Sequence, residues 1–328
     1  MNNIEKIKAY HEVESFLDND QKKILIEMLN LQDENLEKRI PGLMVEDEFA
    51  LILHFLDNCK HIISIDETTA FLTTESYQND FILYFKNNSK IMVEVKSTQD
   101  ENFKISQKIV SKKIEFAKEL GFELYFVLKM RNFWTMYHSK YLIENDCKIN
   151  FKKDLLKSEF QKVLNNKILI VPKNIRTESL YDKGALGSGL IFINYKYGEL
   201  INFKLFYEEK LIFEVTPENT EYYQHMVMLE CWHEMMAKNE SIIQLNEYQT
   251  LVKDFSDELF MTFDFQYFLS SMKTSLRNKD NTYHSSSFLK YLVEERDIFI
   301  NKNLLYSVLN DIIKLGIPIN ILDMEKYK

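Results

Sequence analysis

The sequence is poor in the residues that interrupt regular structure or cross-link a chain. Its 328 residues include seven glycines, four prolines and three cysteines. So few glycines and prolines exclude long flexible linkers and low-complexity tracts. Cys59, Cys147 and Cys231 are far apart and odd in number, which argues against a disulfide framework or a cysteine-rich metal site and fits a reducing cytoplasm.

Long apolar runs are also missing. Residues 1–14 mix Lys, Glu and His and lack the apolar stretch of a secretory signal peptide. No apolar run approaches the roughly 18 residues that a membrane-spanning helix needs. The 45% hydrophobic content is ample for a packed interior, and the length suggests two domains. We therefore expect a cytoplasmic protein of more than one domain, without membrane attachment.

Positive charge is scarce over the whole chain but not along one stretch of it. The net charge is −9, and only five of the 41 basic residues are arginines, which counts against a nucleic-acid-binding protein because phosphate contacts need cations. Residues 86–140, however, carry eleven basic and six acidic side chains, a local excess of five positive charges. What matters for a bound polyanion is this local field.

The apolar pattern of the first half predicts a mixed α/β unit. After a break at Pro41-Gly42, a buried helix face is indicated by the spacing of Val45, Phe49, Ile52 and Leu56. We expect a helix over 104–120, ended by Gly121, and strands at 61–65, 80–85, 91–96, 124–129 and 133–137. The order of helix, three strands, helix and strand describes a short sheet between helices.

The second half predicts a mixed, mainly helical domain with a small antiparallel sheet. We expect a helix at 154–164, a loop from Pro172 to Gly189, and strands at 190–195, 200–206 and 211–215. The remainder reads as helices centred on 220–237, 246–254, 262–276, 284–296 and 302–315. The predicted division is an N-terminal helical segment at 1–41, a domain at 42–149, and a C-terminal domain at 150–328 for recognition, regulation or oligomerisation.

Three charged residues of one predicted hairpin form the candidate site. Glu94 and Lys96 are two residues apart in a strand, so they point to the same face. Asp80 begins the preceding strand and can lie beside Glu94 across the ladder. Adjacent carboxylates repel each other unless a cation lies between them. Mg²⁺ or Mn²⁺ fits there, bound by both carboxylates, the Val95 backbone carbonyl and water.

This arrangement resembles the PD-(D/E)XK motif of the restriction-endonuclease-like nuclease superfamily. Asn79-Asp80 is followed, after thirteen residues, by Glu94-Val95-Lys96, and the predicted element order over about residues 42–138 agrees with the superfamily's core. The resemblance implies that Asp80 and Glu94 are metal ligands and that Lys96 is the catalytic lysine, beside the attacking water and the scissile phosphate. Asn79 replaces the motif's proline, which removes no ligand.

The superfamily also often uses a glutamate from the first core helix, where Glu46, Asp47 and Glu48 are available. Glu48 is followed by Ile52 at i+4 and lies on the apolar, inward face. We therefore expect Glu48 to be the catalytic glutamate and a candidate metal ligand, with Glu46 as the alternative.

The predicted helix after the motif carries a lysine stripe. Lys104, Lys108 and Lys112 follow one another at four-residue spacing, with Gln107 beside them. Such a stripe is either a solvated helix face or a contact with nucleic-acid phosphates. In related nucleases a polar residue of this helix assists the site or touches the phosphate backbone, and the resemblance implies such a role for Gln107 and Lys108.

These expectations combine into a Mg²⁺-dependent phosphodiesterase, a DNA endonuclease by preference, in a bacterial defence, restriction or mobile-element system by analogy. One alternative is a nuclease-fold binding or assembly subunit whose site is inactive. Another is one component of a larger complex, acting with partner subunits or as a homodimer, for which the acidic net charge is easiest to understand. The sequence does not separate DNA from RNA.

Overall fold

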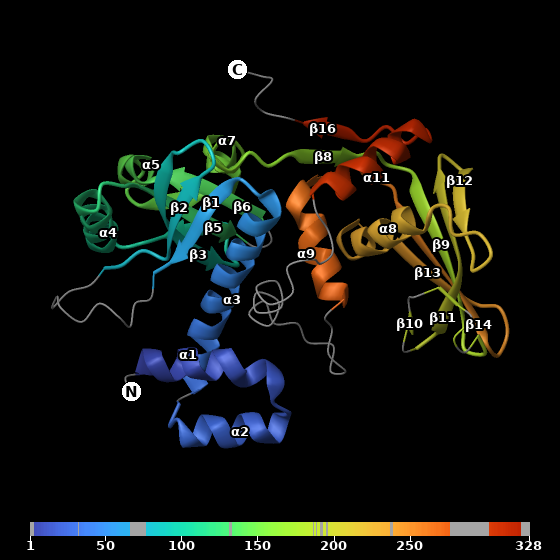
Figure 1. The fold of residues 1–328 in the computed structure, drawn as a ribbon, viewed down its shortest axis with the longest axis horizontal. Helices are drawn as coiled ribbons and strands as arrows, with labels where there is room; N and C mark the ends of the chain where they lie inside the picture. The colour runs from blue at the N-terminus through green and yellow to red at the C-terminus, as the bar shows by residue number, and fades with distance from the viewer. Residues whose placement is uncertain are drawn as a thin grey trace. The chain divides into compact units, whose positions relative to one another are not determined.

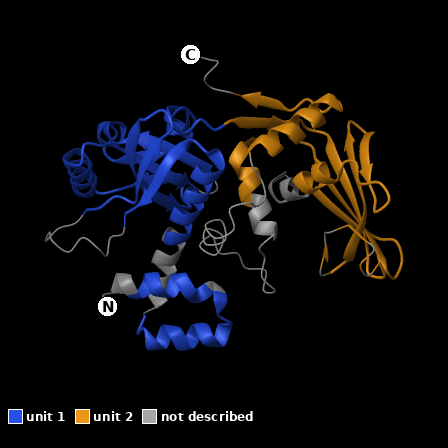
Figure 2. Cartoon of the chain, viewed as in Figure 1, with its two compact units in different colours: residues 1–166, 276–298 blue, residues 167–275, 299–328 orange. Residues whose placement is uncertain are grey.

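The structure is a computed structural model that describes residues 3–31, 33–65, 77–130, 133–185, 187, 189–190, 193–194, 196–236, 239–275 and 302–322. The chain forms two compact units, the first from residues 1–166 and 276–298 and the second from residues 167–275 and 299–328 (Figure 2). No helix in the described part of the chain is long and apolar enough to cross a membrane. The three-part division at residues 41 and 149 stays a prediction.

The first unit begins with three helices, α1 (Asn3–Val13), α2 (Asn19–Met28) and α3 (Asp33–Leu56). Helix α3 runs through Pro41 and Gly42, so the break predicted there is wrong. A proline removes one hydrogen bond from a helix and need not end it when the following turns are stabilised by packing. Here the following turns are buried, as predicted, at Phe49, Ile52 and Leu56.

Five strands of the first unit form a mixed sheet in the order β1-β2-β3-β5-β6 (Figure 1). They are β1 (Cys59–Ser64), β2 (Phe81–Phe85), β3 (Lys90–Thr98), β5 (Glu123–Met130) and β6 (Phe133–His138), which confirms the five predicted strands. Strands β3 and β5 are parallel and the other neighbours are antiparallel. A parallel pair needs a crossover connection, and α4 (Gln107–Glu119) supplies it.

Helix α4 is shorter at its start than predicted. Asn102–Lys104 forms the short strand β4, which pairs with β7 (Lys148–Asn150), so Lys104 is not helical. The predicted end at Gly121 is confirmed: its φ is +75°, and the Phe122 amide donates to the Ala117 carbonyl at 2.9 Å. This is the hydrogen-bond pattern that a glycine in the left-handed region allows after a helix.

Helices α3 and α4 cover opposite faces of this sheet. Val110 and Ala117 of α4 pack in one cluster with Met92 and other side chains of the sheet. Phe49 of α3 instead contacts Phe81 and stacks on Trp134 at 5.8 Å between ring centroids. Because neighbouring residues of a strand point to opposite faces, the side chain at each strand position faces either α3 or α4. This orientation decides which charged groups can meet.

The remainder of the first unit is made of short elements. They are α5 (Ser139–Glu144), α6 (Phe151–Asp154), a 3₁₀ turn at Leu155–Lys157 and α7 (Phe160–Leu164). The single helix predicted over 154–164 is therefore interrupted. The Ser158 hydroxyl accepts a hydrogen bond from the Met136 amide at 3.0 Å and holds this segment against β6.

The second unit contains more sheet than predicted. A six-stranded sheet joins β10 (Ile193–Asn194), β11 (Gly198–Tyr207), β9 (Ile175–Asp182), β14 (Gln249–Ser256) and β13 (Asn239–Gln244), with β12 (Lys210–Val215) paired to β11. A second sheet has the order β15-β8-β16, from Phe260–Phe263, Ile168–Val171 and Asn320–Leu322. The helices among the described residues of this unit are α8 (Tyr223–Met236), α9 (Asp264–Ser275) and α11 (Lys302–Lys314).

Two predictions for this unit are wrong, and the physical reason is clear for β9. The loop predicted before Gly184 contains β9, and the helix predicted over 246–254 is β14. Every second residue of β9 is buried, but these include Thr177 and Ser179 as well as apolar side chains. Polar residues at buried positions conceal the two-residue period that identifies a strand. Helices near 220–237, 262–276 and 302–315 are present, and the helix predicted at 284–296 lies outside the described residues.

The loop that ends in Gly189 carries three glycines, as phosphate-binding loops often do, but two of its amides are already paired. The amides of Gly187 and Gly189 both donate to the Glu199 carboxylate, at 2.6 and 2.9 Å. The two donors that a bound phosphate would need are therefore already paired with an internal carboxylate.

A buried histidine ties α1 to α3 and gives the first unit a pH-dependent stability. His11 is 6% exposed, and its ring nitrogens lie 3.0 Å from Glu14 and 3.1 Å from Asp47. Burial lowers the pKa of His11, but its hydrogen bonds to Asp47 and Glu14 outweigh that effect and raise the pKa to about 9. The charged imidazolium is thus stabilised in the folded state.

We predict that the wild-type protein loses up to about 3 kcal/mol of unfolding free energy as pH rises from 6.5 to 9. The folded-state pKa lies above the unfolded value, so the contribution is complete below pH 6.5 and lost through pH 9. Urea unfolding at several pH values measures it. The His11→Gln variant should lack this slope, and identical profiles for variant and wild type would contradict the prediction.

Candidate active site

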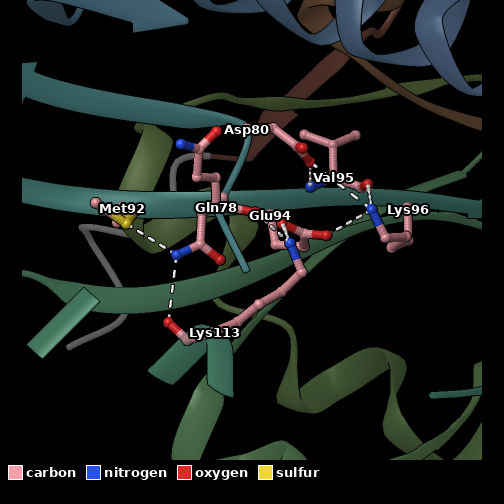
Figure 3. Close-up of polar contacts among 8 residues, drawn as sticks. Gln78, Asp80, Met92, Glu94, Val95, Lys96 and Lys113 are labelled. Atoms are coloured by element: carbon pink, nitrogen blue, oxygen red, sulfur yellow. Dashed lines mark hydrogen bonds and ion pairs between the residues drawn. The ribbon is translucent and has the colours of Figure 1, made fainter. Parts of the chain in front are cut away.

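The structure brings Asp80, Glu94 and Lys96 together, as the sequence predicts (Figure 3). Phe81 pairs with Val93 across the β2–β3 ladder, so Asp80 comes next to Glu94 at the following position. Asp80 Oδ2 accepts a hydrogen bond from the Val95 amide at 2.6 Å, which fixes its carboxylate against β3. Both carboxylates are buried, Asp80 at 6% and Glu94 at 1% exposure.

The ammonium group of Lys96 lies among three oxygen atoms. Its Nζ is 2.5 Å from Glu94 Oε1, 3.0 Å from the Val95 carbonyl oxygen and 3.9 Å from Asp80 Oδ2. These three groups are among the metal ligands that the sequence predicts, which also include Glu48 as a candidate. Lys96 is also the most accessible member of the site, since its side chain is 37% exposed.

A second lysine, which the sequence analysis did not single out, completes the site. Lys113 Nζ donates to Glu94 Oε2 at 2.7 Å and also to the Gln78 backbone carbonyl (Figure 3). Its side chain is 8% exposed, which is rare for a lysine. Its position along α4 could have indicated its burial. Lys113 lies three residues after Val110 and four before Ala117, on the buried face of the helix.

Asn79, which stands where the motif has proline, is fully buried. Its Nδ2 lies 2.9 Å from Met92 Sδ and 3.3 Å from the Lys113 carbonyl oxygen, so it links the strand pair to α4. Burial is tolerable here because the amide donors have partners, although Asn79 Oδ1 and Gln78 Oε1 have none within the described part of the chain.

The two candidate glutamates of the first core helix have different surroundings. Glu48 is inward-facing and buried, as predicted, but its carboxylate pairs with Lys129 at 2.5 Å. Lys129 lies opposite Trp134 in the β5–β6 ladder and on the α3 face of the sheet, whereas Glu94 shares the α4 face with Met92. Glu46 instead acts on the site electrostatically, since its negative charge helps to raise the pKa of Lys96.

The predicted nucleic-acid contacts are spread over two elements. Gln107 and Lys108 are exposed in the first turn of α4, and Lys104 is exposed on β4. Lys112 is partly exposed and lies 3.8 Å from Glu115. The structure thus gathers Asp80, Glu94 and Lys96 in the site, whereas these four side chains are exposed or partly exposed.

Burial and mutual repulsion shape the electrostatics of the carboxylates. Burial and the neighbouring Glu94 charge raise the pKa of Asp80 to about 7, although Lys96, the Val95 amide and Lys113 oppose the shift. The same carboxylates raise the pKa of Lys96 above its ordinary value despite the opposing effect of burial. An additional cation beside Asp80 would therefore favour its ionised form.

Comparison with known proteins identifies a family for the region that carries this site. A family model described as archaeal Holliday junction resolvase (Hjc) matches residues 72–168. This region is a PD-(D/E)XK-type nuclease domain. The matched residues include Asp80, Glu94, Lys96 and Lys113 but neither Glu46 nor Glu48.

Among solved structures, the chain is similar to Hjc from Archaeoglobus fulgidus, a Holliday junction resolvase from an archaeal hyperthermophile. The two are 20% identical over 33% of this chain and 88% of that chain, with a TM-score of 0.28. The assignment to the superfamily rests on the family match. None of the curated proteins compared with the chain matches it.

The oxygen atoms of the nuclease domain fit a hard divalent cation. The described residues contain no group of three or more His, Cys, Asp or Glu side chains suited to a metal. Asp80, Glu94 and the Val95 carbonyl nevertheless supply three oxygen atoms, and water completes such a set in magnesium sites. The position of the Lys96 ammonium among them shows that a cation is accommodated there.

We predict that Lys113→Ala lowers the free energy of unfolding by about 3–5 kcal/mol, because it leaves the buried Glu94 carboxylate short of a charged partner. Lys112→Ala is the matched control. It removes a more exposed lysine from the same helix and should change stability by only about 0.5 kcal/mol. Urea unfolding of both variants measures the difference, and equal losses would contradict the pairing.

Proposed function

We propose that the first unit is a metal-dependent nuclease that hydrolyses phosphodiester bonds in DNA, with Mg²⁺ or Mn²⁺ as the cofactor. The observation that carries the proposal is the convergence of Asp80 Oδ2, Glu94 Oε1 and the Val95 carbonyl on one cation position. This convergence lies inside the region that matches a family of DNA junction resolvases. Branched DNA is therefore the first substrate class on which to test endonuclease activity.

Each residue of the site has a distinct part in the proposed reaction. When bound, a divalent cation would polarise the phosphate and lower the pKa of a coordinated water. Asp80 and Glu94 would hold that cation, and the Val95 amide keeps the Asp80 carboxylate in place. The Lys96 ammonium would orient the attacking water and offset the charge that develops on the phosphate.

We assign the first-helix carboxylate of the site to Glu46 rather than Glu48. Glu48 is neutralised by Lys129 on the α3 face of the sheet. Glu46 contributes to the raised pKa of Lys96, which supports a role for its carboxylate in attracting a cation or orienting its water. Glu46→Gln should consequently reduce cleavage more than Glu48→Gln does.

We predict that purified protein nicks or linearises DNA with Mg²⁺ or Mn²⁺ and that a chelator abolishes this activity. Asp80→Asn and Lys96→Met should each reduce the rate by about 100-fold or more, because each removes a group that acts on the transition state. The substrates are a four-way junction, a linear duplex and a single strand of the same sequence, and a supercoiled plasmid. Lys118→Met, which changes an exposed lysine of α4, is the control.

The outcome separates the proposed functions. Cleavage that is lost in both site variants and kept in the control supports the nuclease. Tight DNA binding without cleavage at any metal concentration would instead identify a binding or assembly subunit with the nuclease fold. Cleavage that appears only with a partner protein would identify a component of a larger complex.

The lysine stripe is proposed to contact phosphates. The double variant Lys108→Ala/Lys112→Ala should reduce the steepness with which DNA affinity falls with salt, by about 0.9 for each phosphate that is no longer neutralised by a lysine. Titrations at several salt concentrations measure this slope. Lys118→Ala/Lys140→Ala, two exposed lysines of the same unit, is the control. An unchanged slope in the first variant would make the stripe an ordinary solvated surface.

The setting of the activity is proposed by analogy. A bacterial defence, restriction or mobile-element system, a cytoplasmic location, and a recognition, regulatory or dimerising role for the second unit remain predictions from the sequence.

A further inference from the structure

The two lysines of the site contact the same carboxylate in different ways. Lys113 binds Glu94 Oε2 and Lys96 binds Glu94 Oε1, so each oxygen of this buried group has its own cation. The ammonium on the Oε1 side, that of Lys96, also lies 3.0 Å from the Val95 carbonyl oxygen and 3.9 Å from Asp80 Oδ2. The place of the predicted metal is therefore the place of the Lys96 ammonium.

The lysines also differ in their freedom to leave. Lys113 Nζ is held by a second acceptor, the Gln78 carbonyl, and its side chain is 8% exposed. The Lys96 side chain is 37% exposed, so it is partly accessible to solvent. Releasing Lys113 would bury an uncompensated Glu94 oxygen, which is costly, whereas the Lys96 ammonium can regain water.

We propose that Lys96 is the resident cation of the free protein and that Lys113 is a fixed positioning residue. On metal binding the Lys96 ammonium leaves Glu94 Oε1, while Lys113 keeps Glu94 Oε2 and restricts Glu94 to one metal-facing oxygen. This inference rests on the proposed function, because it assumes a divalent cation at Asp80 and Glu94. It adds that the metal and the lysine compete for one place.

The direct test is lysine acetylation of the wild-type protein, quantified by mass spectrometry with and without Mg²⁺ or Mn²⁺. If metal releases the Lys96 ammonium from Glu94, labelling of Lys96 rises at least fivefold when metal is added. Lys113 should stay unlabelled in both states, and the exposed Lys118 should be labelled equally in both. Labelling of Lys96 that is unchanged or reduced by metal, or labelling of Lys113 that rises with it, would overturn the proposal.

Calorimetric titration of Mn²⁺ supplies a second, independent readout. Lys96→Met should bind Mn²⁺ at least tenfold more tightly than wild type, because the competing ammonium is gone. Lys113→Met removes the same charge from the same carboxylate but not from the metal position, so its affinity should rise less than threefold or fall. Equal gains in the two variants would indicate a simple charge effect and overturn the competition.

The titration and the labelling experiment together separate this inference from the proposed function. Wild-type protein that binds Mn²⁺ without releasing Lys96 contradicts the displacement alone and leaves the nuclease proposal standing. Wild-type protein and Lys96→Met that both fail to bind metal contradict the two together. Circular dichroism of each variant before titration shows whether it is folded, and the labelling test does not depend on any variant.

Discussion

The placement of Glu94 between two ammonium groups is the interaction on which the nuclease domain depends. A carboxylate at 1% exposure is stable only if its charge is matched and its oxygens are paired. Lys96, from the same strand, forms an ion pair with Glu94 Oε1, and Lys113, from helix α4, forms one with Oε2. Because Lys113 also binds the Gln78 carbonyl, one side chain joins the crossover helix, the central strand and the segment before β2.

The alternation of side chains along the strands explains which charged groups can form ion pairs with one another. Glu94 and Lys113 meet on the α4 face, and Glu48 and Lys129 form a separate pair on the α3 face. The sheet between them keeps two buried ion pairs apart. One pair lies beside the accessible Lys96 and the Val95 carbonyl, where oxygens converge. The other lies beside Trp134, where the Glu48 carboxylate offsets the charge of Lys129 and the indole ring makes a cation–π contact with it.

The order of elements in the nuclease domain and the Asp80–Glu94–Lys96 cluster could be predicted because both depend on local spacing. Hairpin register and a two-residue period place these three groups without any long-range information. Lys113 could not be identified by charge, since a helical lysine is ordinarily exposed and only its phase beside Val110 and Ala117 indicated burial. Glu48 was inward as expected, but its partner depends on a strand 81 residues away. The strand β9 was missed because Thr177 and Ser179 occupy buried positions.

The attachment of Glu94 to α4 has a consequence for when the domain becomes competent. The β2–β3 hairpin can form early because its contacts are local, and it already carries Asp80, Glu94 and Lys96. Until α4 docks, however, Glu94 Oε2 lacks its fixed partner and the carboxylate can rotate. Docking requires the parallel strand β5, which follows α4 in the chain. An incompletely synthesised or partly folded chain thus carries the motif without a formed site, so the site is completed only as folding finishes.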